Sequence, residues 1–176
     1  DEMRLLLGSI YRERETNALS EKAFRKALEL DPGYADALAN LCLMFEESAQ
    51  IEAAAKASLD GCGRFPGDPR FTLTLAKCER RQGEVAAAIE RLSGIDLEHQ
   101  SGEFQAQTYY ELGRLWDRQD AATKAFDCFS KANEIIASGL SGDIKRAFYP
   151  KILKASSRFY AKGGLPSRKI KTRKDD

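Results

Sequence analysis

The chain has 176 residues, of which 43% are hydrophobic and 31% are charged, and its formal net charge at neutral pH is +1. The length is that of one domain, and the composition suits a soluble helical protein. No apolar run approaches the roughly 18 residues that a membrane-spanning helix needs, so we expect no membrane partner. Because the chain opens with Asp1 and not with methionine, we expect it to be part of a longer protein.

A motif near the start of the chain returns in its second half. Leu-Gly-x-x-Tyr at residues 7–11 recurs as Leu-Gly-x-x-Trp at residues 112–116. After each motif, at the same distance, come a small residue, a phenylalanine and an alanine, within residues 20–27 and 125–132. Such a recurrence indicates an internal repeat.

The register of the repeat follows from two prolines, Pro32 and Pro66, which lie 34 positions apart (66 − 32). A period of about 34 residues is typical of stacked helical hairpins and not of one closed globule. The fourth unit fits only if it starts at Ala106, which leaves three extra residues in the connection between Gly94 and Gly102. The sequence therefore predicts an all-α array of about four helical hairpins, at residues 1–34, 35–68, 69–102 and 106–139.

Each unit carries an apolar stripe on its first helix and small residues where its two helices cross. Apolar or small residues fall at positions 4, 7, 8 and 11 of a unit, and this spacing places them on one face of a helix. The stripe consists of Leu38, Leu41, Cys42 and Phe45 in the second unit and of Tyr109, Leu112, Gly113 and Trp116 in the fourth. Close crossing requires little bulk at positions 8 and 20. These positions hold Gly8, Cys42, Ala76 and Gly113, and Ser20, Ala54, Ala88 and Ala125.

Proline and glycine mark the expected ends of the helices. Pro32 and Pro66 should end the second helices of the first two units, because proline cannot continue a helix and restricts the residue before it. Gly83 should break the chain between the two helices of the third unit, and Asp120 occupies the matching position of the fourth. The second helix of the third unit should end early, near Gly94.

These residues resemble the tetratricopeptide-repeat (TPR) family over about residues 1–139. The resemblance implies a right-handed superhelix, or solenoid, of antiparallel helix pairs. A further helix is expected at 140–162, kinked at Pro150, and we expect it to cap the apolar face of the last unit. Residues 163–176 are expected to form a basic linker or tail. This tail contains no aromatic residue for base stacking, so we expect no nucleic-acid partner.

No pattern in the chain predicts catalysis, a metal site or a cofactor, so we expect this segment not to be an enzyme. Its four cysteines lack zinc-site spacing and are interpreted as reduced thiols that pack like small apolar residues, which favours a cytoplasmic location. They are Cys42, Cys62, Cys78 and Cys128. His99 is interpreted as a solvated loop residue without an orienting carboxylate. Glu46 and Glu47 are expected to face water.

The TPR resemblance places the first helix of each unit along a concave groove, at positions 2, 5, 9, 12 and 13. This groove is then acidic in the second unit and basic in the third and fourth. Guanidinium groups offer forked donors to a carboxylate or phosphate. We expect the groove to bind an extended peptide or a helix of a partner protein. The residues expected to contact the partner are Lys77, Arg80, Arg81, Tyr110, Arg114 and Arg118.

Two alternative functions are left open. Residues 125–133, Ala-Phe-Asp-Cys-Phe-Ser-Lys-Ala-Asn, precede an expected helix and a basic linker. This order resembles the end of the repeat region in bacterial TPR sulfotransferases, and it implies an accessory arm whose catalytic domain would follow Asp176. The other alternative is an oligomerisation scaffold, in which the array associates with copies of itself.

Overall fold

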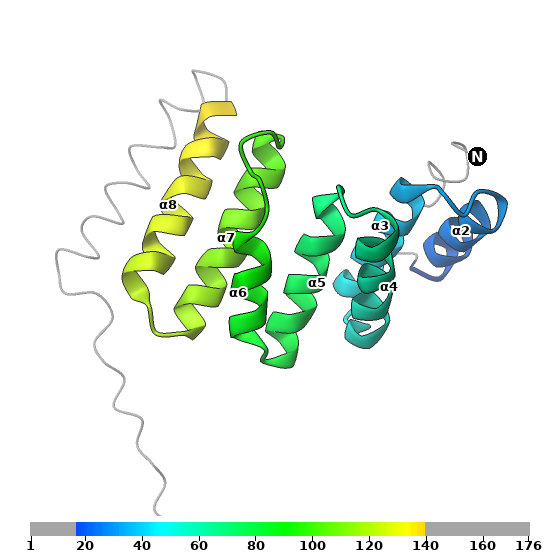
Figure 1. The fold of residues 1–176 in the computed structure, drawn as a ribbon, viewed down its shortest axis with the longest axis horizontal. Helices are drawn as coiled ribbons and strands as arrows, with labels where there is room; N and C mark the ends of the chain where they lie inside the picture. Colours follow the sequence, from blue (N-terminus) through cyan, green and yellow to red (C-terminus); the bar gives the residue numbers. More distant parts are fainter. Residues whose placement is uncertain (1–16, 140–176) are drawn as a thin grey trace, which may run out of the picture.

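The computed structural model describes residues 17–139, which form seven helices and no strand (Figure 1). The expected first helix of the first unit, the expected helix at 140–162 with its kink at Pro150, and the tail at 163–176 lie outside the described residues. In chain order the helices are α2 (Asn17–Leu30), α3 (Ala35–Glu47), α4 (Ile51–Arg64), α5 (Pro69–Gln82), α6 (Val85–Ser93), α7 (Gly102–Arg118) and α8 (Ala122–Gly139).

Consecutive helices pack against one another along the whole described chain. The pairs α3–α4, α5–α6 and α7–α8 form hairpins, and each hairpin packs on the next. In addition, α3 contacts α5 and α5 contacts α7, so the first helices of successive hairpins lie side by side. This arrangement is an all-α solenoid, as the period of the sequence predicted (Figure 1). In the described part, no helix is both long enough and apolar enough to cross a membrane.

The helices end where proline and glycine predicted. Helix α2 ends at Leu30, two residues before Pro32, and α4 ends at Arg64, two residues before Pro66. Helix α6 ends at Ser93, directly before Gly94, so its early end is confirmed. Local chemistry also fixes the start of α5, because the Asp68 side chain accepts a hydrogen bond from the backbone N–H of Arg70 and Pro69 occupies the first turn.

The turn inside each hairpin contains one residue with a left-handed backbone. Gly83 has a φ of 90°, and Asp120, at the matching position of the fourth unit, has a φ of 56°. Ala49 takes this position in the second unit with a φ of 60°. Glycine adopts this conformation freely and aspartate tolerates it, whereas the β-carbon of alanine makes it unfavourable by about 1–2 kcal/mol.

We predict that Ala49→Gly stabilises the protein, although glycine usually destabilises one. The substitution relieves the backbone strain at an exposed turn, and the gain should exceed the entropy cost of glycine by about 0.5–1 kcal/mol. Urea denaturation followed by circular dichroism measures the change. The matched control is Ala86→Gly, at an exposed site in the first turn of α6, which should lose stability by up to about 1 kcal/mol, because glycine there relieves no strain. Equal losses in both variants would contradict the prediction.

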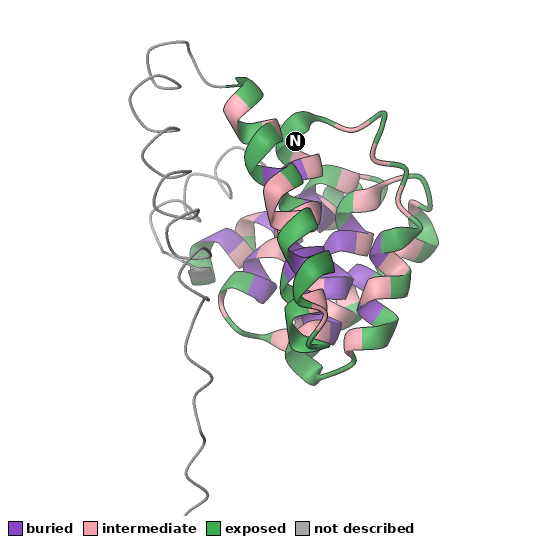
Figure 2. Cartoon of the chain, turned by 90° about the vertical axis from the view of Figure 1, so that its left-hand side faces the viewer, coloured by how far each residue is buried: buried purple, intermediate pink, exposed green. Residues whose placement is uncertain are grey.

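The positions expected to hold small residues lie at the centre of the packing. The described members are buried, and these are Ser20, Cys42, Ala54, Ala76, Ala88, Gly113 and Ala125. Figure 2 shows the buried residues on the inner sides of the helices and the exposed residues on the outside. At Gly113 a β-carbon would lie 2.5 Å from Cε1 of Phe129, which is too close for any real contact. Bulk is therefore excluded where α7 and α8 cross.

In the second hairpin, a side chain from the third hairpin takes the place of larger residues on α4. Its second helix carries Ser58 and Gly61 where the first unit has Phe24 and Ala27. The ring of Phe71, on α5, is fully buried against this part of α4, and a β-carbon on Gly61 would lie 2.6 Å from two of its ring carbons. Phe71 therefore fills the space that a larger residue on α4 would occupy, and it couples the second hairpin to the third.

Two of the four cysteines belong to the core. Cys42 and Cys78 have no exposed surface, and burial raises the pKa of each thiol to about 11. Both thiols are therefore neutral at physiological pH and pack as small apolar groups, as the sequence predicted.

Candidate functional site

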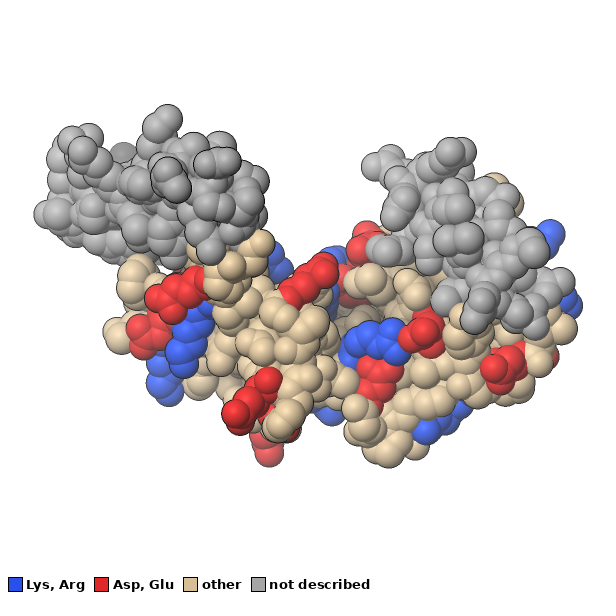
Figure 3. All heavy atoms as spheres, turned by 90° about the horizontal axis from the view of Figure 1, so that it is seen from above, with Lys and Arg blue, Asp and Glu red and all other residues tan. Residues whose placement is uncertain are grey.

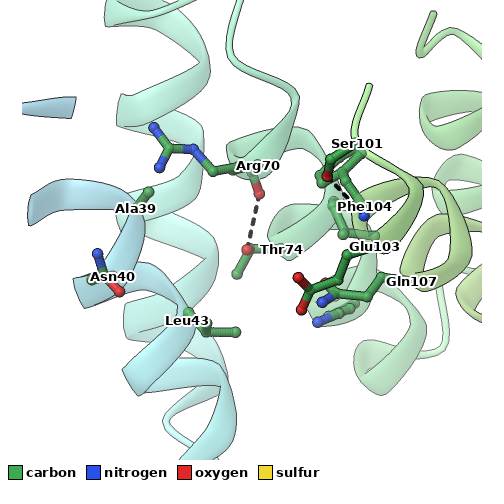
Figure 4. Close-up of a pocket in the computed structure, with 11 residues that line it drawn as sticks. Ala39, Asn40, Leu43, Arg70, Thr74, Ser101, Glu103, Phe104 and Gln107 are labelled. Carbon is green, nitrogen blue, oxygen red and sulfur yellow. Dashed lines mark hydrogen bonds between the residues drawn. The ribbon is translucent and has the colours of Figure 1, made fainter. Parts of the chain in front are cut away.

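A pocket of about 250 Å³ lies between α3, α5 and α7, the three neighbouring first helices (Figure 4). Ala39 and Leu43, at positions 5 and 9 of the second unit, line it from α3, and Leu73 and Lys77, at the same positions of the third, line it from α5. These four residues were expected to face the groove. Residues from the start of α7 complete the pocket, namely Ser101, Glu103, Phe104 and Gln107.

The wall that α7 contributes was not predicted from the sequence. Helix α7 begins at Gly102, four residues before the expected start of the fourth unit at Ala106. The hydroxyl of Ser101 accepts a hydrogen bond from the backbone N–H of Phe104 and so caps the helix at this earlier point. A serine followed by an acidic residue in the first turn is a recognised start signal, so Ser101 and Glu103 could have indicated the extra turn.

The acidic and basic parts of the groove neutralise each other. Arg70 on α5 forms ion pairs with Asp36 on α3, at 2.7 Å, and with Asp68, at 2.6 Å. Arg81 lies 2.5 Å from a carboxylate oxygen of Glu46. Glu46 is buried, with 5% of its surface exposed, so the expectation that it faces water was wrong. Seen from above, basic and acidic side chains lie next to one another and do not form separate patches (Figure 3).

Three of the six residues expected to bind a partner, namely Arg80, Arg114 and Arg118, form one hydrogen-bonded cluster with the buried carboxylate of Glu111. Glu111, on α7, is 1% exposed and accepts hydrogen bonds from Arg80 on α5 and from Arg114, the latter at 3.2 Å. Arg118 donates to the backbone oxygen of Arg80 at 2.8 Å. The charge of Arg80 therefore stabilises the contact between α5 and α7, because an unpaired carboxylate at this depth would be strongly unfavourable.

Tyr110 and Lys77 are the two expected contacts that lie outside this cluster and form no ion pair within the described residues. Tyr110 contacts α8, whereas Lys77 lines the pocket. The Tyr110 hydroxyl donates to Oδ1 of Asn133 at 2.6 Å, and its ring lies beside Phe129, so it is oriented toward α8. Lys77 alone among the six lines the pocket, and it forms no ion pair within residues 17–139.

A second, more open pocket of about 480 Å³ lies around the connection between α6 and α7, lined in part by Pro66, Arg91 and Asp96. Here the Nδ1 atom of His99 lies 2.9 Å from Oδ2 of Asp96, a carboxylate contact that was not expected. The hydrogen bond from His99 lowers the pKa of Asp96. Both side chains are largely exposed, as expected for a solvated loop. The described residues contain no group of three potential metal ligands.

Solved structures with a similar fold are TPR proteins, which agrees with the solenoid of paired helices. PilF of Pseudomonas aeruginosa is 20% identical, with a TM-score of 0.70 over 94% of this chain and 77% of that one. MamA of Desulfovibrio magneticus RS-1 is 20% identical, with a TM-score of 0.63 over 80% of this chain and 77% of that one. YrrB, reported as a TPR protein with an unusual peptide-binding site, is 20% identical, with a TM-score of 0.58 over 73% of this chain and 64% of its own.

At these identities the similarity establishes the fold alone. No protein-family model matches the chain, and no curated protein matches it. The comparisons give no support to the resemblance to sulfotransferases.

Proposed function

We propose that this array is a non-catalytic protein-interaction module whose groove across α3, α5 and α7 binds an extended peptide or a helix of a partner protein. The observation that carries the proposal is the pocket between these helices, which combines an apolar floor with a few polar groups. The peptide-binding site reported for YrrB, which shares the fold, is consistent with it. The pocket of about 250 Å³ lies below the range of about 300–1,000 Å³ typical of small-molecule sites, which favours one or two side chains of a partner.

The structure changes which of the expected residues we assign to the partner. Lys77 is retained, because it lines the pocket and forms no ion pair within the described part. Arg114 and Tyr110 are proposed as contacts at the α7 end of the groove. Arg80 and Arg81 are proposed to act mainly in holding the first helices together through Glu111 and Glu46 (both buried), and Arg118 supports them through the backbone of α5.

We predict that Leu43→Arg abolishes peptide binding while leaving the fold intact. Leu43 is half-buried, lines the pocket, and in Figure 4 its side chain lies in the gap between α3 and the other two helices. An arginine there introduces bulk and charge on the apolar floor. A phage-displayed library of random short peptides, selected on immobilised wild-type protein, supplies the probe, and fluorescence anisotropy of the selected peptides should show at least a tenfold loss of affinity, about 1.4 kcal/mol.

The matched control is Leu59→Arg, because Leu59 is 63% exposed on α4 and does not line the pocket. This variant should bind the selected peptides as the wild type does. If Leu59→Arg abolishes binding and Leu43→Arg does not, the binding surface is elsewhere and the proposed groove is wrong. Failure to enrich any peptide over an unrelated bait would also count against the proposal.

Two other functions remain as proposals with their own tests. If the array associates with copies of itself, light scattering should give a mass of more than one chain. If part of a second copy occupies the groove, Leu43→Arg should reduce this mass to that of one chain. An accessory arm of a sulfotransferase rests on residues 125–133 and predicts that a strand and a phosphosulfate-binding loop follow Asp176 in the gene.

A further inference from the structure

The charged side chains that line the pocket differ in whether they already have partners. Arg70 is held by Asp68 and Asp36, and the hydrogen bonds to these two carboxylates raise the pKa of its guanidinium above the usual value. It is therefore already neutralised before any ligand arrives. Lys77 and Glu103 line the same pocket, and neither forms an ion pair with another residue in the described part of the chain. These two groups are the charges that a ligand could satisfy.

Lys77 and Glu103 belong to different walls of the pocket. Lys77 lies on α5, one turn after Leu73, and Glu103 lies in the first turn of α7, next to Phe104. In Figure 4 the Glu103 carboxylate points toward the space between α7 and α3, and the Leu43 side chain faces it from α3. The two charges are therefore presented along with apolar surface from Leu43, Leu73 and Phe104.

A ligand binds this pocket most tightly when it carries a negative charge near Lys77 and a positive charge near Glu103. An acidic group beside Lys77 and a basic group beside Glu103 each form a favourable contact, whereas a ligand with two like charges places one of them next to a like charge. Leu43, Leu73 and Phe104 line the same pocket, and this apolar surface favours an uncharged, apolar side chain of the ligand beside the two charged groups. An anion alone would satisfy Lys77 but would be repelled by Glu103.

We propose that the pocket recognises a peptide segment in which one apolar side chain is flanked by an acidic side chain, which pairs with Lys77, and a basic side chain, which pairs with Glu103. This inference rests on the proposed peptide-binding function and specifies its ligand. It replaces the expected clamp for a carboxylate or phosphate, because Arg80 and Arg81, which would have formed that clamp, are paired with Glu111 and Glu46.

The test uses selection of the random-peptide library on four proteins: the wild type, Lys77→Glu, Glu103→Lys, and the double variant with both charges exchanged. Neither residue has an ion pair to lose within residues 17–139, and Glu103→Lys removes only the interaction of an exposed carboxylate with the start of α7, so all four should retain the helical circular dichroism of the wild type. The wild type should enrich peptides with an acid and a base on opposite sides of an apolar residue. Each single variant should bind these peptides about tenfold more weakly. The double variant should select peptides in which the acid and the base have exchanged places along the chain.

The outcomes separate this inference from the function on which it rests. If Leu43→Arg abolishes binding but the three charge variants select the same peptides as the wild type, the groove binds peptides and the charge rule is wrong. If the wild type enriches peptides with two acidic groups, the pocket reads an anion and the charge rule is wrong as well. If Leu43→Arg leaves every selected peptide bound, both proposals fail together. A dimer in light scattering that dissociates on addition of the selected peptide would show that a second copy competes for the same pocket and would support the assignment of the site.

Discussion

Replacing Gly61 with alanine should destabilise the protein by about 2 kcal/mol or more, although alanine is the better helix former. The added β-carbon would lie 2.6 Å from two ring carbons of Phe71, whose ring is fully buried and stacked on Phe65 with 5.7 Å between the ring centroids. Because the ring is enclosed by α3, α4 and α5, it cannot move away without opening the contact between two hairpins. Urea denaturation followed by far-ultraviolet circular dichroism measures the loss.

Gly63 provides the matched control for this prediction, since it lies on the same helix and a β-carbon there would meet nothing within 4 Å. Gly63→Ala should leave the stability unchanged or raise it by up to about 1 kcal/mol. Adding Phe71→Leu to Gly61→Ala should recover part of the loss, because the smaller side chain makes room for the methyl group. If Gly61→Ala is as stable as Gly63→Ala, the close packing between α4 and α5 is not as described.

Replacing Arg80 with methionine should cost about 3 kcal/mol, a large effect for one side chain of the groove. The substitution removes the main partner of Glu111, which is 1% exposed and would retain, among residues 17–139, only Arg114 as a charged partner. A buried carboxylate without sufficient donors is much less stable than one in water, so the folded state becomes less favourable. Thermal and urea denaturation measure the effect.

Arg114→Met tests the same carboxylate from its exposed side. The Arg114 side chain is 57% exposed, so its loss should cost less than about 1 kcal/mol. Replacing both Arg80 and Glu111 with methionine should restore most of the stability, because no unpaired charge is then left in the interior. A loss below 1 kcal/mol for Arg80→Met would show that Arg80 is not needed for the fold and would return it to the candidates for partner binding.

The helices and their ends were predictable because they depend on neighbours in sequence. The prolines after α2 and α4 and the left-handed turn at Gly83 act within a few residues, so a single sequence reveals them. The small residues at the helix crossings were predictable for a different reason. A 34-residue repeat presents the same crossing several times, so the requirement for little bulk recurs at fixed positions.

The state of the groove could not be predicted in the same way. The sequence places Arg80, Arg81 and Glu46 on the correct faces, but whether they pair depends on the distance between neighbouring first helices. When each helix is considered alone, these residues predict one acidic and one basic region of the groove. Once α3, α5 and α7 lie side by side, the same residues become partners, and Lys77 is left as the one expected contact that lines the pocket.

Helix α7 begins at Gly102, four residues before the start of the fourth unit at Ala106, a difference that arises because the spacing of the apolar stripe locates the repeat but not the first turn of a helix. The sequence register placed Gly102 at the end of the third unit and Glu103 in the connection, and their role as the first turn of α7 depends on the cap that Ser101 provides. This turn supplies a wall of the pocket. The first turn of α7 lies outside the repeat pattern, so the repeat could not predict this wall of the pocket.

The ion pairs between neighbouring first helices have a consequence for how the molecule melts. Asp36 with Arg70, Glu46 with Arg81, and Arg80 with Glu111 each join one hairpin to the next. Detachment of any of these hairpins breaks the ion pairs at its interface together with the apolar contacts there, so fraying of one unit loses both kinds of interaction. In a linear array, such nearest-neighbour coupling favours unfolding of all units in a single transition over their stepwise detachment.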